Sequence, residues 1–174
     1  MNSALGAAFV DRSRRYLADD FLPRNLAALD RLSDADLWWR PNEASNSSAN
    51  LVLHVCGNAR QWIVAGVGGE PDERERQAEF DARGGVTRAE LVALLERTFA
   101  DVDRTLRDFD PGRLLERRTI QGGEVTLLEA ILHVVEHVSH HAGQILWIAK
   151  ARSGDDLGLW RVEDGVATPT WRSK

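Results

Sequence analysis

Four of the five histidines in this 174-residue chain lie within the segment 133–141, at His133, His137, His140 and His141. A helix turns by about 100° per residue, so positions four, seven and eight residues apart share one face, and Gln144 extends the same stripe. Buried imidazoles are costly without partners, and a divalent metal ion is the partner that binds several of them at once. The spacing therefore predicts a metal-binding helix.

His137 and His141 can reach one ion from one helical face, because they are spaced i, i+4. His54 lies in a second helical segment and can supply a third ligand. Three histidines without an obligatory fourth protein ligand describe an open site, which suits zinc, nickel, cobalt or iron(II). The alternative is a set of hydrogen-bonded core or surface histidines. The His-Glu-x-x-His pattern of zinc proteases does not occur, and Glu136 is expected to orient His140 or to pair with an arginine.

The helical segment around His54 carries a polar row on an otherwise apolar helix. This row indicates either a cavity with hydrogen-bonding walls or a solvent-exposed face. Its members are Asn50, His54, Asn58, Gln61 and Trp62.

Hydrophobic periodicity predicts four long helices, with almost no strand signal. Pro23 should kink or break the first helix, while Thr87–Glu90 and Thr126–Glu129 form capping boxes that open the third and fourth. The last helix is apolar nearly all round, which predicts a central position and an interior histidine stripe. The expected helices span residues 2–32, 47–67, 87–109 and 126–151, with a polar loop over 70–86, a hairpin-like excursion over 117–125 and an irregular tail over 152–174.

Composition excludes several classes of function. The net charge is −5 and no basic patch is evident, which argues against nucleic-acid binding. The charged run 72–77 is interpreted as a solvated loop, and the single Cys56 as a small buried core residue. Neither a signal peptide nor an apolar stretch long enough for a membrane span is visible, so we expect a cytoplasmic protein without membrane contact.

Three stretches together resemble the DinB-like (YfiT-like) superfamily of metal-binding four-helix bundles. They are 37–41 with 46–54, the continuation 57–63, and 137–145, which is similar to that superfamily's His-x-x-x-His…Gly-Gln signature. The resemblance implies an all-α, up-down four-helix bundle over residues 1–151, followed by the irregular tail 152–174. It places nickel or zinc on His54, His137 and His141, with His133 and His140 as additional histidines.

The function implied by this resemblance is a metal-dependent thiol S-transferase, because characterised relatives use bacillithiol or mycothiol. A metal ion with an open position lowers the pKa of a bound thiol or water and makes it a nucleophile. A low-molecular-weight thiol would attack a small electrophile, whereas bound water would make the protein a hydrolase. The third alternative is a non-catalytic metal-binding stress protein.

The remaining expectations concern the pocket mouth and the quaternary structure. In an up-down bundle the second and fourth helices run in the same direction, which would bring the 38–46 loop and the 117–124 excursion to one end. Arg40, Arg117 and Arg118 would then bind an anionic substrate or a thiol carboxylate, unless they are surface charges paired with Glu43 or Glu116. Exposed-looking aromatic residues around the second helix, together with the resemblance, predict a homodimer.

Overall fold

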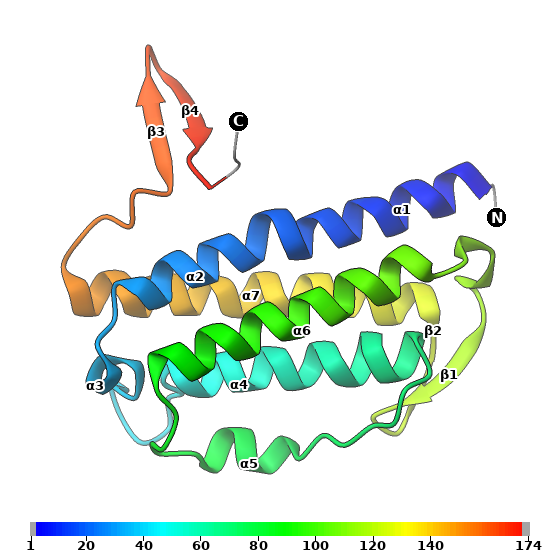
Figure 1. Cartoon of the computed structure of the whole chain (residues 1–174), viewed down its shortest axis with the longest axis horizontal. Coiled ribbons are helices and arrows are strands. Elements are labelled where there is room, and N and C mark those ends of the chain that lie inside the picture. Colours follow the sequence, from blue (N-terminus) through cyan, green and yellow to red (C-terminus); the bar gives the residue numbers. More distant parts are fainter. Residues whose placement is uncertain (1–2, 172–174) are drawn as a thin grey trace.

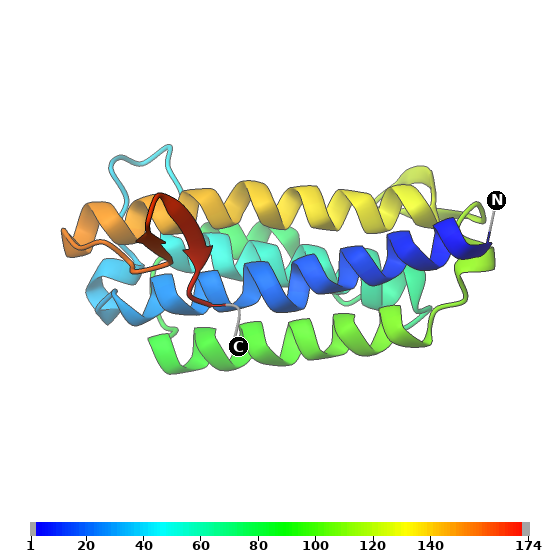
Figure 2. The same cartoon turned by 90° about the horizontal axis from the view of Figure 1, so that it is seen from above.

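The computed structural model describes residues 3–171 and is mostly helical, with two small antiparallel hairpins. The four long helical segments lie alongside one another (Figures 1 and 2), and buried aliphatic and aromatic side chains fill the space between them. These segments are α1 Ser3–Arg15 with η1 Tyr16–Phe21 and α2 Leu22–Asp30, α4 Ser48–Ala59 with η2 Arg60–Val67, α6 Arg88–Asp108, and α7 Leu127–Ser153. The shorter helices are α3 Asp34–Leu37, α5 Arg76–Asp81 and η3 Pro111–Arg113.

Capping boxes start three of the long segments. The side chains of Thr87 and Thr126 each accept a hydrogen bond from the backbone N–H three residues later, as predicted. Ser47 caps α4 in the same way, with Asn50 in place of the usual Glu or Gln. Gly154, with φ of 72°, ends α7 in the left-handed conformation.

The first long segment is continuous through Pro23 rather than broken there. The chain widens into the π-helical turns of η1, in which the Leu22 N–H donates to the Leu17 carbonyl, and then continues as α2. Proline has no N–H and its ring crowds the carbonyl four residues earlier, and the wider turn before Pro23 accommodates both effects. Residue 2, where the helix was expected to begin, lies outside the described residues.

The long segments do not alternate in direction, so the predicted up-down order is wrong. Residues 70–86, which we call the crossing segment, run back beside α4 and include α5, so α6 begins at the end where α4 begins (Figure 1). Because both begin at that end, α4 and α6 are parallel. Asn58 meets His133, whereas the earlier residue His54 meets the later residue His137, so α4 and α7 are antiparallel.

One face of α7 is exposed, which corrects the expectation of a fully central helix. Leu132 and Trp147 are 51% and 61% exposed. His137 and His141 are half-buried on the side that packs against α4. Within residues 3–171, every helix falls short of the length or the apolarity that a bilayer crossing requires.

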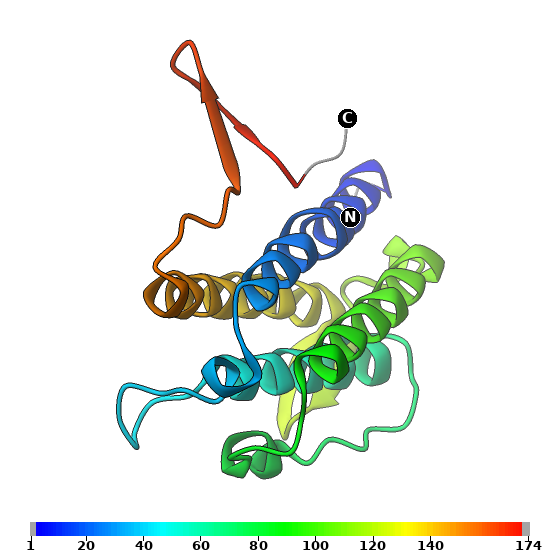
Figure 3. The ribbon, with the colours of Figure 1, turned by 60° about the vertical axis from the view of Figure 1, so that its left-hand side comes forward.

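Two hairpins complete the described chain. β1 Arg117–Ile120 pairs with β2 Gly123–Thr126, which confirms the predicted excursion. β3 Trp160–Glu163 pairs with β4 Val166–Pro169, so the irregular tail is wrong over this stretch. Asp164 and Gly165 both have positive φ in the turn, and an Asp-Gly pair is a strong hairpin signal. Figure 3 shows this second hairpin standing away from the helices; residues 172–174 lie outside the described part.

Candidate metal centre

Three histidines converge between α4 and α7. One nitrogen from each of His54, His137 and His141 lies within 4.8 Å of the others, and Nε2 of His54 is 3.0 Å from Nε2 of His137. Two nitrogens bound to one ion at ~2.1 Å and at right angles would be about 3.0 Å apart. Within residues 3–171 no carboxylate or thiolate joins this group, so the three imidazoles leave coordination positions open.

Hydrogen bonds fix the tautomer of two of these imidazoles. His54 Nδ1 lies 2.8 Å from Glu79 Oε2, and His141 Nδ1 lies 2.7 Å from Gln144 Oε1. Both partners are acceptors, so each Nδ1 carries the proton and each Nε2 keeps its lone pair. The two facing Nε2 atoms of His54 and His137 suit a cation between the rings.

Burial disfavours protonation of the half-buried histidines on α7. Burial, followed by the neighbouring His141 and His54, lowers the pKa of His137 to about 3. Burial also lowers the pKa values of His133 and His141. Metal binding requires deprotonated imidazole nitrogens, and the lowered pKa values of His137 and His141 favour that form near pH 7.

The metal-free protein is expected to lose stability as the pH falls from 6.5 to 5. Below pH 6.5 His137 binds a proton in the unfolded state but not in the folded state, because its pKa is lower in the folded state than in the unfolded state. Allowing for partial exposure, this one group should cost about 1 kcal/mol at pH 5. Urea unfolding at pH 7 and pH 5, with a chelator present, measures this difference in the free energy of unfolding. The His137→Asn variant should show a smaller pH dependence, and an unchanged one would contradict the assignment.

The other two histidines of α7 lie outside the three-histidine group. The His133 ring stacks on Trp62 with 4.1 Å between centroids, and its Nε2 is 3.1 Å from Asn58 Nδ2. His140 is exposed, with Gln144 Nε2 3.5 Å from its Nε2. Glu136 is exposed beside the stripe. Since Trp62 is packed in this way, it adds little to an exposed aromatic face, and the homodimer stays a prediction.

The crossing segment covers the polar row on α4 at Asn50 and Gln61, and Gln61 also lines a cavity beneath that segment, as one of the two interpretations expected. Asn50 Nδ2 donates to the carbonyls of Glu79 and Ala82 at 2.9 Å each. Gln61 donates to Asp72 and accepts from Arg74. The predicted solvated loop is therefore wrong for Arg74, whose side chain is only 3% exposed. Its guanidinium donates hydrogen bonds to Glu79 and Gln61.

The three predicted anion-binding arginines do not share one pocket mouth. Arg40 is half-buried in the α3–α4 connection, with its Nη2 3.4 Å from Asn50 Oδ1. Arg117 and Arg118 are exposed on β1 at the opposite end of the helices (Figure 1), and Arg118 pairs with Glu116 as the alternative interpretation expected. The common mouth is wrong because α4 and α7 are antiparallel. Binding of an anionic ligand by these arginines stays a prediction.

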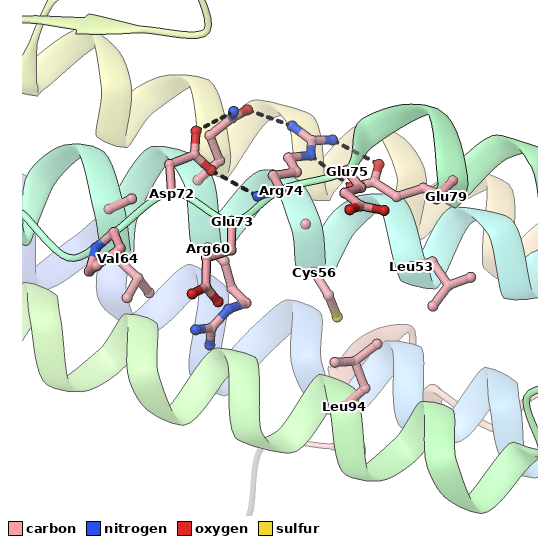
Figure 4. Close-up of a pocket in the computed structure, with 15 residues that line it drawn as sticks. Leu53, Cys56, Arg60, Val64, Asp72, Glu73, Arg74, Glu75, Glu79 and Leu94 are labelled. Atoms are coloured by element: carbon pink, nitrogen blue, oxygen red, sulfur yellow. Dashed lines mark hydrogen bonds and ion pairs between the residues drawn. The ribbon is translucent and has the colours of Figure 1, made fainter.

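Two cavities flank α4. One, of about 540 Å³, lies between the 41–46 loop and α7, where His140, Gln144 and Trp147 form part of its wall. The other, of about 420 Å³, lies beneath the crossing segment on the side of α6 (Figure 4). Cys56 borders the second cavity but is buried, which confirms it as a small buried core residue. Burial raises the pKa of its thiol to about 12.

Comparison with known proteins identifies a family without an assigned activity. The profile of DUF1572, described as a protein of unknown function, matches residues 8–165. A solved structure, described as the conserved protein of locus from Enterococcus faecalis, superposes with a TM-score of 0.62 at 14% identity, covering 89% of this chain and 99% of that one. Such an identity shows a shared fold alone, and no curated protein matches the sequence. Because the family profile spans most of the chain, this protein belongs to the DUF1572 family.

Proposed function

We propose that this protein is a DinB-like metal-dependent thiol S-transferase that joins a low-molecular-weight thiol to a small electrophile. The observation that carries the proposal is the group of three converging imidazoles, two of which have a hydrogen-bond acceptor at Nδ1. The four long helical segments, with ligands from α4 and α7, are consistent with the four-helix bundle of that superfamily.

His54, His137 and His141 would hold nickel or zinc, since neutral nitrogen ligands suit both. A bound ion of this kind stabilises the thiolate form of a thiol and so supplies a nucleophile at neutral pH. Gln144 fixes the orientation of His141 by accepting from its Nδ1. The chain thus provides an oriented ligand set and leaves room for a thiol.

The 540 Å³ cavity is the proposed electrophile site, because its volume falls within the range of small-molecule pockets. Gln144 belongs to its wall and also contacts His141, which joins the cavity to the metal centre. Trp147 offers an apolar surface. In the transfer a carbon–sulfur bond forms, and the leaving group departs with the electron pair of the broken bond. The thiol loses a proton, and the imidazole of His140 in the cavity wall would accept it.

Metal-loaded protein is expected to consume a thiol and a halogenated aromatic electrophile in equal amounts. The assay follows free thiol and released halide with bacillithiol, mycothiol and glutathione in parallel. Chelated protein and the His137→Ala variant should remain at the background rate. Halide release without thiol loss would support a hydrolase instead, and the absence of turnover in fully loaded protein with every thiol would support a non-catalytic metal-binding protein.

A further inference from the structure

We propose that the crossing segment orients a ligand of the metal centre. Glu79 is a positioning residue for His54, and Arg74 holds Glu79 in place. This inference rests on the proposed metal site and concerns how its ligand on α4 is prepared. The crossing segment meets His54 on the side away from His137, so it contacts neither the open coordination positions nor the cavity assigned to the electrophile.

Two consecutive residues of α5 fix the His54 ring. Glu79 Oε2 lies 2.8 Å from Nδ1, with the two side chains only 10% and 7% exposed. Phe80 packs against the ring with 4.6 Å between centroids. Glu79 therefore selects the tautomer that leaves Nε2 free, and Phe80 restricts the tilt of the ring. A histidine ligand held through its second nitrogen binds metal more tightly because its orientation is already set.

Arg74 holds the Glu79 carboxylate with two hydrogen bonds. Its Nε donates to Oε1 at 2.7 Å and its Nη2 donates to Oε2 at 2.9 Å, while its Nη1 donates to Gln61. Burial by itself raises the pKa of Glu79, but the hydrogen bonds from Arg74 and His54 lower it below the ordinary value. Glu79 thus accepts hydrogen bonds from Arg74 and His54 within a buried network.

The same guanidinium creates a competing arrangement. Arg74 Nη2 is 3.1 Å from His54 Nδ1, and it can only donate. With Glu79 present, both groups donate to Oε2. Without Glu79, Arg74 would donate to Nδ1 and move the imidazole proton to Nε2, the atom that must bind metal. Glu79 is thus needed to keep Nε2 available, and its effect depends on Arg74.

Two features of helix α4 allow the crossing segment to pack closely against it and bind it there. A Cβ on Gly57 would lie 1.9 Å from Glu79 Oε1 and 3.0 Å from Arg74 Nε, so only glycine leaves room for the pair. Asn50, one turn before His54, donates from its amide to the Glu79 and Ala82 carbonyls. Figure 4 shows Arg74 and Glu79 lying over α4 with their hydrogen bonds.

Zinc titration by calorimetry tests the contribution of Glu79 to affinity. Glu79→Gln, which keeps the side-chain shape, and Glu79→Ala should each weaken zinc binding by about 10- to 100-fold. Glu75→Ala is the matched control, because Glu75 is an exposed carboxylate of the same segment that lines the 420 Å³ cavity. Its affinity should stay within about threefold of the wild type. Equal affinities for the wild type and both Glu79 variants would overturn the proposal.

Nitrogen-15 NMR of the metal-free protein tests the tautomer directly. The His54 proton should lie on Nδ1 in the wild type and on Nε2 in Glu79→Ala. Adding Arg74→Ala to Glu79→Ala should remove this preference for Nε2. An Nδ1 proton in all three proteins would overturn the positioning role. If the wild type binds no zinc, the proposed metal function fails, yet the metal-free spectra still decide the role of Glu79. Gly57→Ala, which keeps both charges, should reproduce the Glu79→Ala spectrum.

Discussion

Replacing His137 by alanine is expected to lower the affinity for zinc or nickel by more than about 100-fold, beyond the usual cost of losing an outer-shell partner. His137 lies at the centre of the group, since its Nε2 is 3.0 Å from that of His54 and its ring is 4.5 Å from that of His141. Removing it leaves two imidazoles from different helices. Metal content after dialysis and calorimetric titration measure the loss.

His133→Ala is the matched control for this variant. His133 lies one turn earlier on the same face of α7, but it packs on Trp62 and is not one of the converging ligands. Its replacement should change metal affinity by less than about tenfold, which is the low end of an outer-shell effect. Comparison of His140→Ala with His141→Ala tests the register. Loss of metal in the His140 variant alone would show that the ligand is one residue away from its assigned position.

Removing the metal is expected to lower the free energy of unfolding by about 4 kcal/mol when free metal is 1,000 times the dissociation constant. A metal that binds only the folded state contributes this stability by mass action. For a chain of this length, the melting temperature should fall by roughly 8–16 °C. Differential scanning calorimetry with added zinc and with a chelator gives the difference.

The variant without His54, His137 and His141 provides the control for this stability effect. Its melting temperature should be the same with zinc and with chelator, since its folded state has lost the ligand set. A zinc-dependent rise that survives the triple substitution would mean that the ion binds elsewhere, and the assigned centre would then be wrong.

Local signals in the sequence were sufficient for the histidine centre. The i, i+4 spacing of His137 and His141 fixes both on one face of α7, and the Thr126 capping box fixes where that helix begins. His54 could be added because it lies on a polar row of another helix. The relative direction of these helices could not be derived in the same way. It depends on whether residues 70–86 turn back at once or first cross the length of α4, and either path satisfies the helical periodicity.

The sequence pattern also does not predict the role of Arg74 and Glu79. Alternating charges in the segment 72–77 are typical of a solvated loop, and Glu79 follows within the same polar stretch. Only the folded arrangement reveals that Gly57 opens a space on α4 that these two side chains fill. The Asp164-Gly165 turn differs, because the Asp-Gly pair is itself a hairpin signal within the sequence.

The crossing segment also separates the assembly of the centre into an early and a late step during folding. His54 and Glu79 are 25 residues apart, whereas His54 and His137 are 83 residues apart. Closing the longer loop costs about 1 kcal/mol more in chain entropy than closing the shorter one. During synthesis His54 and Glu79 are both present before the residues of α7 are made. The proposed ion would be held by all three ligands only after α7 has docked, because His137 and His141 lie on that helix, so an acquired ion would mark a chain whose last long helix is in place.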